Sequence, residues 1–127
     1  MVERTVVSTK KAPGAIGPYS QGIKVGEFVF TSGQLPMDPE TGELVDDIKE
    51  ATKRSLDSVK AILEEAGSSM ENIIKTTIFV KDLDDFAAVN EVYGTYFNEE
   101  PPARSCVQVA KIPKDAKVEI EAIAKLK

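Results

Sequence analysis

A short stretch of the sequence combines residue types that could bind an anion. In "PPARSCVQVA" (101–110), two prolines precede a run that is typical of a short strand. Strict alternation along a strand places Arg104, Cys106 and Gln108 on one face. A guanidinium suits a small anion because it offers several N–H donors in a rigid fork. A solvated edge strand would explain the same pattern without any ligand, so both interpretations stay open at this point.

Two carboxylates alternate with apolar residues further along the chain. In "VEIEAIA" (118–124), Glu119 and Glu121 share one face of the expected strand, opposite the apolar side chains. If the apolar face packs against helices, both acids lie on the other face, and by the same reasoning Arg104 and Cys106 lie there too. That face would suit a small polar ligand, and a solvated sheet face is the competing interpretation.

The distance between these charges depends on how the two strands pair. An antiparallel hairpin across "KIPKDA" (111–116) would place Glu119 opposite Val107, three residues from Arg104. At about 3.3 Å per residue, the two charges would then be about 10 Å apart along the strand direction. We therefore expect no direct Arg104–Glu119 ion pair, which leaves the arginine to bind an external anion.

Three other polar residues each have a structural and a functional interpretation. Asn90 lies within an apolar helical stripe, where it either bonds local backbone or serves another polar partner, because a buried amide without partners costs about 1–3 kcal/mol. Ser32 in "FTSGQLP" (30–36) is either a turn serine or a hydrogen-bond donor to a ligand, since the segment lacks the G-x-S-x-G frame. Cys106 has no identified base beside it, which disfavours a nucleophilic thiol.

The composition excludes several classes of chemistry. The sequence has no histidine and one cysteine, which removes Ser-His-Asp and Cys-His nucleophiles, His-ligated zinc and multi-cysteine metal sites within one chain. Acid–base chemistry must therefore use carboxylates, tyrosine, lysine or bound water. The net charge of −5 and the scattered basic residues disfavour binding to a nucleic-acid backbone.

Length and patterning predict one domain over residues 1–127. No apolar run approaches the roughly 20 residues that a membrane span needs, and the first residues lack the apolar core of a signal peptide. With a single cysteine, we expect a cytoplasmic protein with a reduced thiol and no membrane partner.

The elements that would position these side chains follow from periodicity. The firmest is a helix that begins after Asp47, with Glu50 completing a capping-box pattern, and ends at Gly67. A second helix starts near residues 82–85, whose acids suit its N-terminus. Extended segments are expected at residues 3–7, 23–33 (two runs joined by a turn at 25–27), 72–80, 103–110 and 117–126.

The resulting order, β-β-β-α-β-α-β-β, predicts an α+β two-layer sandwich with about six strands. Both helices would cover one face of the sheet. The other face is then either wet or covered by another chain.

Several long blocks of the sequence resemble the RidA (YjgF) family of enamine/imine deaminases. They are "IGPYSQG" (16–22), "TSGQLP" (31–36), "KTTIFVKDLDDFAAVNEVY" (75–93) and "PPARSCVQVAKIPKDAKVEIEAIA" (101–124), and the similarity runs from about residue 5 to 125. The resemblance implies a chorismate-mutase-like fold and homotrimers with sites between subunits. It also implies hydrolysis of 2-aminoacrylate, 2-iminopropanoate and related 2-imino acids to 2-keto acids and ammonia, without metal or cofactor.

The family's site residues match this sequence at Tyr19, Ser32, Asn90, Arg104, Cys106 and Glu119. By this resemblance Arg104 holds the substrate carboxylate through a bidentate fork that lysine could not reproduce. Glu119 would position or deprotonate the attacking water, and Cys106 would contribute backbone groups rather than its sulfur.

The remaining matches are expected to bind and enclose the substrate. Tyr19 and Ser32 would donate hydrogen bonds, and Asn90 would brace the site. We expect Tyr19 and Arg104 of one site to come from different chains. Two other functions stay open: RNA cleavage, which the acidic charge and missing histidine disfavour, and a chaperone-like or regulatory protein that binds 2-keto acids.

Overall fold

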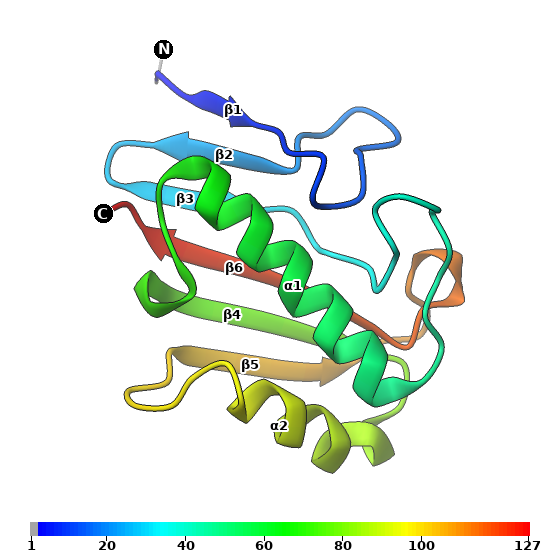
Figure 1. The fold of residues 1–127 in the computed structure, drawn as a ribbon. Coiled ribbons are helices and arrows are strands. Elements are labelled where there is room, and N and C mark those ends of the chain that lie inside the picture. The colour runs from blue at the N-terminus through cyan, green and yellow to red at the C-terminus, as the bar shows by residue number, and fades with distance from the viewer. Residues whose placement is uncertain (1–2) are drawn as a thin grey trace.

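The computed structural model describes residues 3–127 as one mixed sheet with two α-helices (Figure 1). The elements are β1 (Thr5–Val7), β2 (Gly22–Val25), β3 (Phe28–Thr31), α1 (Ile48–Ala66), β4 (Ile73–Val80), α2 (Phe86–Gly94), β5 (Ala103–Gln108) and β6 (Val118–Lys125). Their order is the one that the sequence predicts, and each expected extended segment contains a strand. The α+β prediction is therefore confirmed.

The first helix begins and ends where local signals place it. The Asp47 side chain accepts a hydrogen bond from the Glu50 backbone N–H at 3.1 Å. At the other end Gly67 has φ +90°, the left-handed conformation that favours glycine, and its N–H bonds to carbonyls of the last turn. Between these caps the apolar stripe of α1 packs on the sheet, and Leu56, Ile62 and Leu63 are fully buried.

The strand order is β1-β2-β3-β6-β4-β5, so β6 lies in the middle of the sheet. All neighbouring pairs are antiparallel except β4 and β5. The hairpin assumed above between the last two strands does not form, because β4 lies between β5 and β6. The reason is the connection through α2, which is long enough to return β5 parallel to β4. The other edge of β4 is then free to pair with β6.

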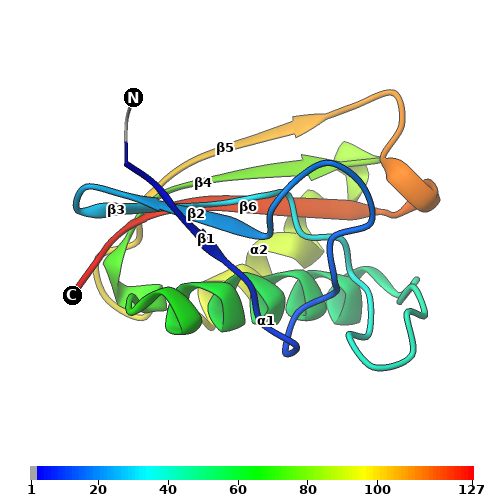
Figure 2. The same cartoon turned by 90° about the horizontal axis from the view of Figure 1, so that it is seen from above.

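Both helices lie on the same face of the sheet (Figure 2), as predicted. The core fills the space between them and the sheet, where Ile78 of β4 and Ile120 of β6 are fully buried. The opposite face, here called the uncovered face, carries exposed apolar side chains. Val6, Phe30 and Val107 are among them. An exposed apolar surface on a sheet is typical of a protein–protein contact.

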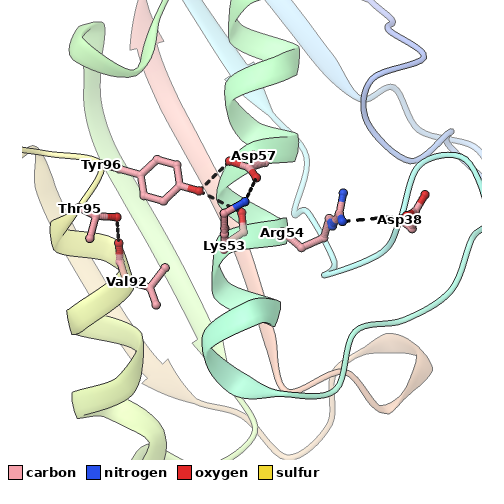
Figure 3. Close-up of polar contacts among 7 residues, drawn as sticks. All are labelled: Asp38, Lys53, Arg54, Asp57, Val92, Thr95 and Tyr96. Atoms are coloured by element: carbon pink, nitrogen blue, oxygen red, sulfur yellow. Dashed lines mark hydrogen bonds and ion pairs between the residues drawn. The ribbon is translucent and has the colours of Figure 1, made fainter.

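A tyrosine joins the end of the second helix to the first. Tyr96 follows α2, and its Oη donates a hydrogen bond of 2.6 Å to Asp57 Oδ1 on α1 (Figure 3). Lys53 approaches the same carboxylate, with its Nζ 3.2 Å from Asp57 Oδ2. Burial, followed by the hydrogen bond and charge of Asp57, raises the pKa of Tyr96 well above its ordinary value. The phenol therefore stays protonated and keeps the two helices connected.

Within residues 3–127, neither helix has both the length and the apolar character needed to cross a membrane.

Candidate active site

A pocket of about 660 Å³ opens beside the start of β6. Its lining includes Tyr19 from the long loop between β1 and β2, Ser32 and Gly33 from the segment after β3, and Glu119 and Glu121 from β6. We call it the Glu119 pocket. Three of the predicted site residues thus lie together: Tyr19, Ser32 and Glu119. Tyr19 belongs to neither a helix nor a strand.

The loop that carries Tyr19 is organised by a buried glutamine. Gln21 Oε1 accepts a hydrogen bond of 2.7 Å from the Thr9 backbone N–H. Its Nε2 lies within hydrogen-bond distance of the carbonyls of Thr9, Ala12 and Pro13. One side chain therefore satisfies the backbone of a segment that has no strand or helix partner. Sequence reasoning missed Gln21; a glutamine inside a glycine- and proline-rich loop was the available signal.

Ser32 ties this loop to the end of β3. Its Oγ donates a hydrogen bond of 2.5 Å to the Ser20 carbonyl, and its backbone N–H bonds to the Gln21 carbonyl at 2.8 Å. The hydroxyl proton is thus used within the chain, whereas the lone pairs of the oxygen remain available to accept. A ligand that donates a hydrogen bond fits this serine better than one that accepts.

Glu119 is half-buried and lies against the backbone of Gly33. A Cβ built on Gly33 would stand 2.5 Å from Glu119 Oε2, so any side chain at position 33 would displace the carboxylate. Burial raises the pKa of Glu119, and the nearby charge of Glu121 raises it further. A carboxyl group with a raised pKa exchanges protons closer to neutral pH, which suits general acid–base chemistry.

The rim of the pocket contains a strained turn. Lys114 lines the pocket and has φ +60°, and the next residue, Asp115, has φ +58°. Consecutive left-handed residues other than glycine are unfavourable and need support from their surroundings. An ion pair of 2.7 Å from Lys81 Nζ to Asp115 Oδ1 supplies part of it.

Arg104 and Cys106 lie on the opposite side of the sheet from this pocket. In the parallel β4–β5 ladder, Arg104 pairs with Thr76 and Cys106 pairs with Ile78. Paired residues point to the same face, and Thr76 and Ile78 are fully buried on the helix side. The prediction that Arg104 and Cys106 share a face with Glu119 is therefore wrong.

The physical reason is that β5 is an edge strand covered only in part. The helix that faces it, α2, offers polar and aromatic groups rather than a closed apolar layer, so polar side chains of β5 can turn inward. Gln108 shows the same behaviour, because its Oε1 accepts a 2.9 Å hydrogen bond from the Leu83 N–H just before α2. Polarity alone does not identify the solvent side of such a strand.

Three residues of α2 surround the guanidinium of Arg104. Its Nη1 donates a hydrogen bond of 2.6 Å to Asn90 Oδ1. Its Cζ lies 5.4 Å from the ring centre of Phe86 and 5.0 Å from that of Tyr93. We call Phe86, Asn90, Tyr93 and Arg104 the Arg104 cluster. The amide of Asn90 thus has a polar partner on β5. Of the two interpretations of Asn90, local backbone bonding and service to another polar group, the structure supports the second.

The thiol beside this cluster is not activated. Cys106 is partly buried, and burial raises the pKa of its thiol more than the positive charge of Arg104 lowers it. A raised pKa leaves little thiolate at neutral pH, and the thiolate is the reactive form. The structure therefore favours a structural or backbone contribution from Cys106.

The two groups of predicted site residues are far apart within one chain. Arg104 aligns through Thr76 with Ala122, whereas Glu119 aligns with Phe79. The predicted offset of three residues is found, but β4 lies between the two strands. The backbone positions are thus about 10 Å apart both along and across the sheet. Since the side chains also point to opposite faces, Arg104 and Glu119 of one chain cannot contact the same small molecule.

Comparison with known proteins relates this arrangement to a family. A sequence model described as Endoribonuclease L-PSP matches residues 9–126. The chain belongs to the RidA (YjgF) family. It is 58% identical over 122 residues to a RutC family protein of Pyrococcus abyssi, covering 95% of this chain and 96% of the relative. It is 54% identical over 121 residues to the 2-iminobutanoate/2-iminopropanoate deaminase of Salmonella typhimurium, covering 93% and 94%.

Solved structures of RidA-family proteins have the same fold. The crystal structure of Escherichia coli TdcF with bound serine has a TM-score of 0.94 at 52% identity and covers 97% of this chain and 99% of that one. Yeast Mmf1 has a TM-score of 0.95 at 42% identity and covers 98% and 100%. Among residues 3–127 of the present family member, no group of three or more cysteine or carboxylate side chains is placed to hold a metal ion.

Proposed function

We propose that this chain is a hydrolytic deaminase that converts 2-aminoacrylate, 2-iminopropanoate and related 2-imino acids to 2-keto acids and ammonia. The observation that carries the proposal is the 54% identity, over 93% of the chain, with a protein named 2-iminobutanoate/2-iminopropanoate deaminase. Arg104, Glu119 and Tyr19 supply the groups that this chemistry needs. A carboxylate must be bound, a water must be activated and the site must be enclosed.

Arg104 is the proposed anchor for the substrate carboxylate. Asn90 uses one of the five N–H donors of the guanidinium, which leaves donors for a bidentate fork. The neighbouring rings of Phe86 and Tyr93, with their centres 5.4 Å and 5.0 Å from Cζ, lie within the range of cation–π attraction. A carboxylate held in this way fixes the direction in which the adjacent imine carbon points.

Glu119 is the proposed base for water. The water oxygen attacks the C2 carbon of the imine, and Glu119 takes the water proton as the carbon–nitrogen π bond opens. This proton passes to nitrogen and gives the carbinolamine. The hydroxyl proton then moves to nitrogen as well, the carbon–nitrogen bond breaks, and ammonia leaves as the carbonyl of the 2-keto acid forms. Tyr19 and Ser32 would bind and enclose the substrate, and the backbone at Cys106 would contribute polar groups. Neither a metal ion nor a cofactor is needed for these steps.

We further propose that the protein is a homotrimer with its sites between subunits. Arg104 and Glu119 cannot meet in one chain, so a complete site needs Arg104 from one subunit and the Glu119 pocket, with Tyr19, from another. The apolar uncovered face, which includes Val6 and Phe30, offers the surface that such an assembly would bury. If the uncovered face were exposed to solvent in a monomer, the Arg104 cluster and the Glu119 pocket would each remain an incomplete site.

Trimers of mixed composition test this arrangement. Arg104→Ala and Tyr19→Ala homotrimers should each be weak, whereas trimers refolded from a mixture should regain activity through the intact sites they contain. Trimers that mix wild-type chains with the double variant control for refolding. Absence of recovery, with chain mixing verified by mass spectrometry, would place both residues in one subunit. A monomer by sedimentation at micromolar concentration would contradict the trimer.

A coupled assay tests the activity itself. Threonine or serine dehydratase generates the imine, and its decay is followed directly in the presence and absence of this protein. We expect faster decay with the wild type and background decay with Arg104→Ala. Binding of 2-ketobutyrate together with background turnover would favour a regulatory protein that binds 2-keto acids. Such a result would contradict the deaminase proposal.

The name of the family model makes RNA cleavage the second function to test. The net charge of −5 argues against it, because binding to a phosphate backbone depends on clustered basic residues. We therefore propose that the protein acts on a small molecule and does not bind nucleic acid. We also propose that it works as one domain in the cytoplasm, without a membrane partner. Ribonuclease activity that survives extensive purification and disappears in Arg104→Ala would contradict this.

A further inference from the structure

The guanidinium of Arg104 lies beside two aromatic rings of the same helix. Its Cζ is 5.4 Å from the ring centre of Phe86 and 5.0 Å from that of Tyr93, within the range of cation–π attraction. Asn90 adds a hydrogen bond from a third position of α2. An arginine at the open edge of a sheet would otherwise sample many rotamers, since its side chain has four rotatable bonds.

Tyr93 is itself held at both ends. Its Oη shares a hydrogen bond of 2.7 Å with Thr76 Oγ1, and Thr76 is fully buried. Its ring packs against Phe97 with the centres 4.7 Å apart. Thr76 is also the β4 residue that pairs with Arg104. Thr76 therefore holds both the Tyr93 ring, which lies beside the guanidinium, and the backbone of Arg104, which carries the guanidinium.

Tyr93 cannot serve as a substrate-binding group in its own right. Only 6% of the surface of Tyr93 is exposed, and its hydroxyl group is already hydrogen-bonded to the Thr76 hydroxyl. Burial raises the pKa of Tyr93 more than the Thr76 hydrogen bond and the Arg104 charge lower it, so the phenol stays neutral. Any effect of Tyr93 on a ligand must therefore pass through Arg104.

We propose that Phe86 and Tyr93 form an aromatic clamp that holds the Arg104 guanidinium in its carboxylate-binding orientation before substrate arrives. The two rings are positioning residues, and Thr76 anchors the inner one. The inference rests on the proposed function in taking Arg104 as the group that binds the substrate carboxylate. A side chain ordered in advance loses less conformational freedom on binding, so the clamp should act mainly on affinity.

Two substitutions at Tyr93 distinguish the contribution of its ring from that of its hydroxyl group. Tyr93→Leu removes the ring and keeps an apolar side chain, whereas Tyr93→Phe keeps the ring and loses only the bond to Thr76. Phe86→Leu removes the outer ring, which is 37% exposed, so this variant tests the clamp even if Tyr93→Leu does not fold. Tyr96→Phe is the control, because it removes the hydrogen bond to Asp57 and leaves the contacts of Arg104 unchanged.

Two measurements decide the proposal. The first is the dissociation constant for 2-ketobutyrate, together with KM and kcat for imine hydrolysis. Tyr93→Leu should weaken binding and raise KM about tenfold, Phe86→Leu about threefold, and both should change kcat less. Tyr96→Phe should stay within about twofold of the wild type because it leaves both clamp rings unchanged. Tyr93→Phe should do so because its ring stays buried and packed against Phe97 without the Thr76 bond. Unchanged affinity in the two leucine variants would overturn the clamp.

The second measurement does not depend on activity. In nitrogen-15 NMR spectra, the Arg104 Nε–H signal, assigned by its loss in Arg104→Ala, should be shifted by the adjacent rings. This shift should persist in Tyr93→Phe and diminish in Tyr93→Leu and Phe86→Leu. An Arg104 signal that is the same in all variants would overturn the clamp. A wild-type protein without imine hydrolysis would refute the proposed function alone, because the NMR shift still tests the clamp.

Discussion

The carboxylate of Glu119 lies so close to Gly33 that a methyl group at position 33 would stand 2.5 Å from Oε2 and 2.8 Å from Cδ. The two residues come from different segments, which two backbone hydrogen bonds hold together. The Gln34 N–H bonds to the Ile120 carbonyl at 2.8 Å, and the Ile120 N–H bonds to the Gln34 carbonyl at 3.2 Å. Glycine is needed here for close approach, and the position of the carboxylate depends on that approach.

Gly33→Ala should therefore move Glu119 without unfolding the protein. The group in collision is the end of a flexible side chain, so we expect it to rotate away, with a loss of stability of about 1 kcal/mol and a fall in kcat of about tenfold or more. Imine decay and thermal unfolding measure the two effects. Gly14→Ala is the matched control, because Gly14 lines the same pocket and an added Cβ meets nothing within 4 Å. Equal activity in the two variants would contradict the role of Glu119.

Glu119→Gln should lower turnover more than it weakens binding of 2-ketobutyrate. A group that activates water acts mainly in the transition state, so kcat should fall about 100-fold while the dissociation constant changes little. Imine kinetics and calorimetric titration provide the two numbers. Equal losses in both would make Glu119 a structural residue.

Glu121→Gln should move the pH dependence of the reaction rather than abolish it. Burial is the larger cause of the raised pKa of Glu119, and the charge of Glu121 is the second. Removing that charge lowers the pKa of Glu119, so the acidic limb of the kcat profile should shift to lower pH. A limb that stays in place would show that another group controls it.

The same raised pKa has a consequence for stability. The folded protein binds the Glu119 proton more tightly than the unfolded chain does, so the free energy of unfolding should fall as pH rises from the ordinary value of 4.5 through the raised pKa. Glu119→Gln should remove this fall. Urea unfolding of both proteins between pH 4 and pH 8 measures the difference, and parallel curves would contradict it.

Arg104→Lys should lose most deaminase activity and keep the fold. Lysine retains the positive charge but lacks the planar fork and the stacking surface, so kcat/KM should fall about 100-fold. Steady-state kinetics and circular dichroism check the two parts. Near-normal imine hydrolysis would remove Arg104 from the carboxylate role.

Cys106→Ala should retain activity within about threefold, because the thiol has a raised pKa and only the backbone at this position is expected to contribute. Steady-state kinetics on the purified variant provide the measurement. Complete inactivation of a folded Cys106→Ala protein would give the sulfur a direct role.

Local signals in the sequence predicted the elements correctly. The side chain of Asp47, the left-handed Gly67 and the apolar stripe between them act within a few residues, so they define α1 without knowledge of the rest of the fold. The hairpin turn at Gly26, with φ +58°, is predictable for the same reason.

Long-range pairing was the part that the sequence did not reveal. The face of Arg104 depends on which strand lies beside β5 and on what α2 places over it, and both are set by residues far away in the chain. A polar residue at a partly covered edge can point either way, and two hydrogen bonds, Arg104 to Asn90 and the Leu83 N–H to Gln108, decide the direction. Gln21 escaped prediction likewise, because its partners are backbone groups 8 to 12 residues away.

The central place of β6 imposes an order on folding. This strand separates the β1–β2–β3 meander from the β4–α2–β5 unit, yet it follows both of them in the chain. During synthesis the two earlier units therefore emerge from the ribosome with unpaired edges, and the sheet closes only when residues 118–125 insert between them. Completion of the sheet thus waits for the last strand to be made. A chain interrupted before Val118 would expose two open sheet edges, and exposed edges favour aggregation.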